Sequence, residues 1–189
     1  MIRKSINIKN MVCPRCITAV EQTLSKLKIP YSEVKLGKAI VESSHIDYIE
    51  LNKELKAIGF EIIQDKNQII AEQIKTLIID FIHHNKGEEL KINFSEYLSK
   101  KTQYDYSYLS NVFSETENTT IEKFIILQKI ERVKELINYN ELNFSEIAFN
   151  LNYSSASHLS KQFKEIVGFT LSAYKKTKIE ERSPIDNVQ

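Results

Sequence analysis

A chain of 189 residues can hold one large domain or two small ones. Its hydrophobic content of 42% and charged content of 27% are typical of a globular protein, and its net charge of +1 favours no class of partner. No run of about 18 apolar residues occurs, and the first residues lack the apolar stretch of a signal peptide. We therefore expect a cytoplasmic protein without a membrane span, whose two cysteines stay reduced.

Residues 1–64 alternate between the patterns of short strands and short helices. Apolar residues two apart indicate strands, and apolar residues three or four apart indicate helices. In chain order we predict a strand ending at Ile8, a helix over 17–27, strands over 34–36 and 39–41, a helix over 48–58 and a strand over 60–63. Gly37 lies in the turn between the middle strands, and Gly59 ends the second helix. This order, βαββαβ, is that of the ferredoxin-like split unit.

Two cysteines, Cys13 and Cys16, lie between the first predicted strand and the helix after it. We expect the positive end of that helix to favour their thiolates and to lower their pKa. Two soft ligands suit Cu(I) or another thiophilic ion, whereas Zn(II) needs further ligands from elsewhere. Met11, before the turn, is expected to face inward as an anchor.

The segment Met11-Val12-Cys13-Pro14-Arg15-Cys16, with Gly37-Lys38-Ala39-Ile40-Val41 and Gly59-Phe60-Glu61, resembles the heavy-metal-associated domains of copper chaperones and transport ATPases. The resemblance covers residues 1–64, and Asn10 stands where those domains usually have glycine. It implies that the cysteine pair binds a soft metal ion such as Cu(I). Two alternatives stay open: thiol redox chemistry, or cysteines that act only as small apolar residues of a domain without a metal.

After a polar break at 65–68 the pattern becomes helical throughout. We interpret 65–72 as a linker, 73–178 as a helical domain and 179–189 as a flexible tail. Apolar residues at helical spacing predict one helix from Ile70 to Phe81 and a longer one through Ile126 and Ile137. The pair His83-His84 falls at the end of the first of these helices, where a cation or a carbonyl hydrogen bond is the usual role, and we do not assign it to a metal.

The helical half contains a self-repeat at an offset of 50 residues. Asn93-Phe94-Ser95-Glu96 returns as Asn143-Phe144-Ser145-Glu146. Ser107, Leu109, Ser110, Phe113 and Glu115 return as Ser157, Leu159, Ser160, Phe163 and Glu165. Two copies are too few for a solenoid, so the repeat suggests one supersecondary unit that is used twice in a single domain.

Each copy has the outline of a helix-turn-helix unit, whose second helix enters the major groove of DNA. Ser95 or Ser145 would help to start the first helix, and Asn152 suits the left-handed residue of the later turn. In each second helix a leucine and a phenylalanine four residues apart point inward, and small polar residues point outward. From periodicity alone, this outer face is equally that of an ordinary helical bundle.

Side chains on the outer face could bind bases or phosphates. The DNA-contact candidates are Ser107, Tyr108, Ser110 and Asn111 in the first copy, Ser155, Ser157, His158, Lys161 and Gln162 in the second, and Lys175 and Lys176 beyond it. Over 161–178 lysines far outnumber acidic residues, so the positive charge that a groove contact needs is local.

A resemblance to a known family favours DNA binding over an ordinary helical bundle. Ile147-Ala148, Tyr153-Ser154-Ser155, the run from His158 to Lys164, Gly168-Phe169-Thr170 and Tyr174-Lys175-Lys176 together resemble the signature of AraC/XylS-family transcription regulators. The match runs over about 68–178, the size of that family's DNA-binding domain, which has two helix-turn-helix units joined by a long helix. Asn152 stands in place of the usual turn glycine, and Leu171 in place of a usual proline.

The sequence therefore predicts an α+β chain: a ferredoxin-like βαββαβ domain followed by an all-α domain of two helix-turn-helix units joined by a long helix. We interpret it as a transcription regulator that binds double-stranded DNA and contacts RNA polymerase, with the N-terminal domain as a candidate sensor of a thiophilic metal. The alternative is a metal chaperone or thiol-redox protein with a helical protein-interaction tail. No further nucleophile, phosphate loop or carboxylate pair stands out, so we do not expect an enzyme.

Overall fold

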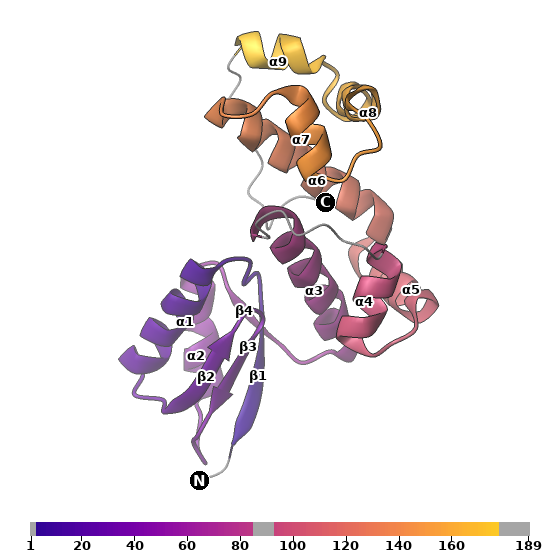
Figure 1. The fold of residues 1–189 in the computed structure, drawn as a ribbon. Helices are drawn as coiled ribbons and strands as arrows, with labels where there is room; N and C mark the ends of the chain where they lie inside the picture. Colours follow the sequence, from indigo (N-terminus) through magenta and orange to yellow (C-terminus); the bar gives the residue numbers. More distant parts are fainter. Residues whose placement is uncertain (1–2, 85–92, 178–189) are drawn as a thin grey trace.

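The computed structural model describes residues 3–84 and 93–177, in which an N-terminal α/β body adjoins an all-helical body (Figure 1). The N-terminal elements are β1 (Lys4–Lys9), α1 (Pro14–Lys26), β2 (Tyr31–Lys35), β3 (Lys38–Val41), α2 (Tyr48–Ala57) and β4 (Glu61–Ile63). The predicted order of strands and helices is confirmed. The predicted tail, 179–189, lies outside the described residues.

The four strands form one sheet in the order β2-β3-β1-β4, with antiparallel neighbours throughout. Ile6 and Ile8 of β1 alternate inward and pack with Val20 of α1 and Leu51 of α2, so both helices share one core with the sheet. Gly37 turns β2 into β3 with a φ of +78°, a conformation that side chains rarely adopt. Ile58, the last residue of the second predicted helix, is the C-cap of α2 and is 47% exposed.

The helical elements are α3 (Lys66–Ile79), the π-helical turn η1 (Asp80–His84), α4 (Phe94–Thr102), α5 (Tyr106–Glu117), α6 (Ile121–Tyr139), α7 (Phe144–Asn150), α8 (Ala156–Val167) and α9 (Leu171–Thr177). The prediction of a linker over 65–72 is wrong, because α3 already begins at Lys66. Asp65 accepts a hydrogen bond of 2.9 Å from the Gln68 N–H and so caps the helix, and the polar residues 66–68 are only its exposed first turn.

Asparagine, and not the predicted serine, caps the first helix of each repeat. Asn93 accepts a hydrogen bond from the Glu96 N–H, and Asn143 accepts them from the Ser145 and Glu146 N–H groups. Glu146 accepts in return from the Asn143 N–H at 2.7 Å, which completes a capping box. The turns that follow contain left-handed residues, with a φ of 61° at Gln103 and, as predicted, of 55° at Asn152.

The long helix α6 joins two helical groups (Figure 1). Near its start Phe124 packs edge-on against Phe113 of α5, and further along Val133 and Ile137 are buried in the same core as Leu159 and Phe163 of α8. The two repeats therefore share one continuous apolar core. Among residues 3–84 and 93–177, no helix combines the length and the apolar character needed to cross a membrane.

Candidate nucleic-acid interface

Helix α8 separates an inner from an outer side. Leu159 and Phe163 are fully buried, as predicted, whereas Ser157, His158 and Lys161 are exposed. The Lys161 side chain is 79% exposed and lies 4.0 Å from the Glu165 carboxylate, so it is available to a partner. The outer side of α8 therefore presents a small residue, an imidazole and an ammonium group together.

The residues before α8 hold its first turn in place. The Ser155 hydroxyl accepts a hydrogen bond of 3.0 Å from the His158 N–H and caps the helix. Ser154 Oγ and His158 Nδ1 share a hydrogen bond of 3.0 Å, and the His158 ring packs edge-on against Tyr153. Ser155, a predicted DNA contact, thus already serves the helix, while His158 is oriented by its neighbours.

Gln162 is half-buried, and its Oε1 accepts a hydrogen bond of 2.8 Å from the Tyr153 hydroxyl. Burial raises the pKa of Tyr153, which keeps this hydroxyl protonated. Lys129 of α6 lies over the Tyr153 ring, 5.0 Å from its centre, and burial lowers its pKa. Sequence reasoning did not single out Lys129, because its contact comes from a helix outside the repeat.

Lys175 and Lys176 are exposed on α9, which is anchored by the buried Leu171 and Tyr174. With Asn143, Phe144 and Ser172 they line a shallow depression of about 340 Å³. The Lys175 ammonium lies 5.9 Å from the centre of the Phe144 ring. Two ammonium groups thus lie beside the start of α7 in the second repeat.

Helix α5 presents a different outer side. Ser107, Tyr108 and Asn111 are exposed, Ser110 is half-buried, and Leu109 and Phe113 face the core as predicted. Tyr106, half-buried at the start of α5, donates a hydrogen bond from its hydroxyl to Glu122 of α6, and this bond lowers the pKa of Glu122. Because the sequence 106–117 contains Glu115 and Glu117 but no lysine or arginine, this side is neutral to acidic.

The cysteine pair lies at the start of α1. Cys13 is the N-cap residue, and the two sulfur atoms are 3.2 Å apart. Burial raises the pKa of the Cys16 thiol, and the contact with Cys13 raises it further. The prediction of a lowered pKa is therefore wrong for Cys16, because desolvation outweighs the helix end. Met11 is fully buried, as predicted.

The pair offers two sulfur ligands to a metal ion. Over the described parts of the chain, no group of three or more histidine, cysteine or acidic side chains is placed to share a metal. Such a pair suits a soft ion that accepts few thiolate ligands, and it does not suit the four-ligand site of structural zinc.

The helical half is similar in sequence to known proteins. Residues 98–177 match the family model of a helix-turn-helix domain. The Msm operon regulatory protein of Streptococcus mutans is 26% identical over 143 residues, which are 75% of this chain and 45% of that protein. The HTH-type transcriptional regulator YdeC of Bacillus subtilis is 23% identical over 124 residues, 66% of this chain and 42% of that protein. The chain spans less than half the length of these two relatives.

The fold is similar to a solved structure, the C-terminal domain of AraT, a response regulator from Geobacillus stearothermophilus. The TM-score is 0.51 at 19% identity, over 64% of this chain and 95% of that one. Residues 98–177 therefore match a helix-turn-helix domain, and the helical half has the fold of this regulator's C-terminal domain. The names of the two relatives describe an operon regulatory protein and a transcriptional regulator, and neither name describes an enzyme. The alternative of a chaperone or redox protein with a helical tail finds no support in them.

Proposed function

We propose that this protein is a sequence-specific transcription regulator that binds double-stranded DNA with α5 and α8. One observation carries the proposal: two repeated helix-turn-helix units, each with an exposed polar helix, are joined by the single helix α6 and share one core. Such linked units read two successive major-groove segments on one side of the duplex, about one helical turn apart.

The second unit supports a division of roles. Ser157 and His158 are exposed at the start of α8, the part of a recognition helix that meets base edges. Lys161, one turn further, can reach a base or a phosphate. Lys175 and Lys176 lie outside α8 and provide charge, so we assign them to phosphates. RNA polymerase stays a predicted partner of the regulator.

A footprint of the full chain on DNA selected from a random-sequence pool tests this function. We expect two protected segments about 10 base pairs apart at about 150 mM salt. Protection of a single segment, or binding without sequence preference, would reject the proposal.

Point variants test the division of roles. His158→Ala should reduce the preference for the selected DNA over other sequences. Lys176→Ala should weaken binding to all sequences alike and reduce the dependence of affinity on salt by about one counterion. His45→Ala, at an exposed histidine before α2, is the matched control and should change neither.

A second function is favoured by the cysteine pair. We propose that residues 1–64 form a ferredoxin-like, heavy-metal-associated type of domain in which Cys13 and Cys16 hold a soft ion such as Cu(I). The strand order β2-β3-β1-β4 and the sulfur separation of 3.2 Å at a strand-to-helix turn support this. Cys13 and Cys16 would hold the ion, which would supply a positive charge beside their thiolates.

Titration with Cu(I) under reducing conditions tests the metal site. The wild type should take up the ion, and a variant with both Cys13→Ser and Cys16→Ser should not. Because the chain has only two cysteines, no other thiol can replace the pair. Equal uptake by both proteins would reject the site.

A further inference from the structure

The loop before the cysteines is held by side chains of the helical half. The Asn10 N–H donates a hydrogen bond of 2.6 Å to Glu72 Oε1 on α3, and the Val12 carbonyl oxygen meets His84 Nε2 of η1 at 2.9 Å. The Val12 side chain packs against the helical core, while Met11 between them is buried in the N-terminal core. Residues 10–13, which we call the joint loop, thus belong to both bodies at once.

Away from this loop the two bodies are less closely packed. A cavity of about 410 Å³ lies between them, lined by Asn7 and Lys38 of the sheet and by Thr76 and Leu77 of α3. The joint loop therefore connects the two bodies together with the contacts of β1 on α3 and the chain that runs from β4 into α3.

One line of contacts runs from the joint loop to the first recognition helix. Lys75 Nζ lies 2.9 Å from Glu72 Oε2 and 3.2 Å from Glu117 Oε1, and all three side chains are 12% exposed or less. Burial alone lowers the pKa of Lys75, but the two carboxylates raise it overall, so the ammonium stays charged. Glu117 is the last residue of α5. A buried charge that loses its partner destabilises the fold strongly. A movement of Glu72 should therefore move Lys75 as well, and with it Glu117 at the end of α5.

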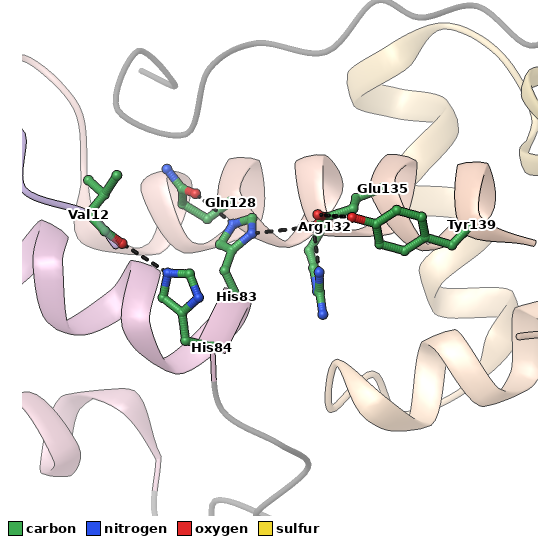
Figure 2. A network of polar contacts seen from close by, with 7 residues as sticks. All are labelled: Val12, His83, His84, Gln128, Arg132, Glu135 and Tyr139. Atoms are coloured by element: carbon green, nitrogen blue, oxygen red, sulfur yellow. Dashed lines mark hydrogen bonds and ion pairs between the residues drawn. The ribbon is translucent and has the colours of Figure 1, made fainter. Parts of the chain in front are cut away.

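A second line runs to the long helix (Figure 2). His83, next to His84 in η1, is buried, and its Nε2 shares a hydrogen bond of 3.0 Å with Gln128 Oε1 on α6. Its Nδ1 lies 3.8 Å from Glu135, which also contacts Arg132 and accepts a hydrogen bond from the Tyr139 hydroxyl. These contacts fix η1 against the helix that connects the two repeats.

We infer that the joint loop is the allosteric connection of the regulator: a ligand that bridges Cys13 and Cys16 alters DNA affinity through the contacts of Glu72 and His84 with this loop. The inference rests on the two proposed functions, DNA binding and metal binding, and adds that each alters the affinity of the other. A bridge between the two sulfurs restricts the backbone at Cys13, and the planar peptide bond carries this restriction to the Val12 carbonyl that His84 contacts. A coupling of this kind changes affinity by about 5- to 150-fold.

The first test compares DNA affinity with and without Cu(I), on the selected DNA. We expect a change of at least about 5-fold in the wild type. His84→Ala removes an exposed side chain, so this variant should take up Cu(I) equally while the change in DNA affinity becomes smaller. Glu117→Gln, which leaves Lys75 paired with Glu72, should reduce the change in part. His45→Ala should retain it in full. Uptake of Cu(I) without a change in DNA affinity, or an equal change in the His84→Ala variant, would overturn the inference.

The second test needs no metal, because coupling is reciprocal. DNA binding should change the rate at which iodoacetamide alkylates the two cysteines in the wild type, and His84→Ala should reduce that change. If Cu(I) fails to bind but DNA still alters alkylation in this way, the metal role is rejected and the joint loop stands. If DNA leaves the rate unchanged in the wild type, the joint loop is rejected whatever the metal result.

Discussion

The two helix-turn-helix units are built from one repeat but are attached and charged differently. The first packs on α3, and its helix α5 ends in Glu117, which pairs with Lys75. The second packs on the far part of α6 and is followed by α9. Asn111 on α5 corresponds to Lys161 on α8 at the offset of 50 residues. The comparison shows how one unit can connect to the N-terminal body while the other supplies the positive charge.

The largest expected effect comes from the matched core phenylalanines. Phe113→Ala and Phe163→Ala each remove a fully buried ring, packed against Phe124 and Tyr174 respectively. Each should lower the free energy of unfolding by about 3–5 kcal/mol in urea titrations. Amide hydrogen exchange should rise in α3–α5 for the first variant and in α7–α9 for the second. A rise over all helices in both variants would show that the units do not differ in attachment.

A pH effect should arise where η1 meets α6, on the side of the first unit. Burial lowers the pKa of His83 from 6.5 to about 4, so below pH 6.5 the unfolded chain binds a proton more readily than the folded one. Stability should be full above pH 6.5 and fall, by at most about 3 kcal/mol, as the pH drops to about 4. Urea titrations of wild type and His83→Gln across this range measure it. The same slope in both proteins would assign the loss to other groups.

An exchange of the matched outer residues tests the difference in charge. Lys161→Asn should weaken DNA binding several-fold and reduce the salt slope by about 1, because one cation is lost at the interface. Asn111→Lys should strengthen binding and raise the slope by a similar amount. Affinities measured between 50 and 200 mM salt, on the selected DNA and on unrelated DNA, give both slopes. Unchanged slopes for both variants would mean that neither position lies near a phosphate.

The smallest effect concerns how the recognition helices begin. Ser155 caps α8 through its hydroxyl, whereas Asp105 at the start of α5 makes no side-chain capping hydrogen bond. Ser155→Ala should therefore destabilise by about 1 kcal/mol, and Asp105→Ala by only a few tenths. Thermal unfolding of the two variants compares them directly. An equal loss for both would remove this distinction between the helices.

Local patterns were enough to predict much of the fold. Alternation at Ile6 and Ile8 indicated β1, and the spacing of Leu159 and Phe163 indicated the buried side of α8. The linker prediction failed because the exposed first turn of a helix has the same polar composition as a loop, and only the capping contact of Asp65 distinguishes them.

The interface between the two bodies had no local signal. Glu72 meets Asn10 across 62 residues of sequence, and His84 meets Val12 across 72. Such pairs depend on how whole elements pack, and periodicity describes only single elements. The role of His84 at the joint loop, and that of Lys129 over the Tyr153 ring, therefore came only from the structure.

Asparagine residues in the left-handed conformation end or follow several helices, with φ near 55° at Asn118, Asn140 and Asn152. Glycine would remove the strain of this conformation, but it would also give the unfolded chain more freedom, and the two effects are of similar size. An exchange of asparagine and glycine at these positions is therefore close to neutral. Either residue can therefore occupy these turns while the helices keep their arrangement.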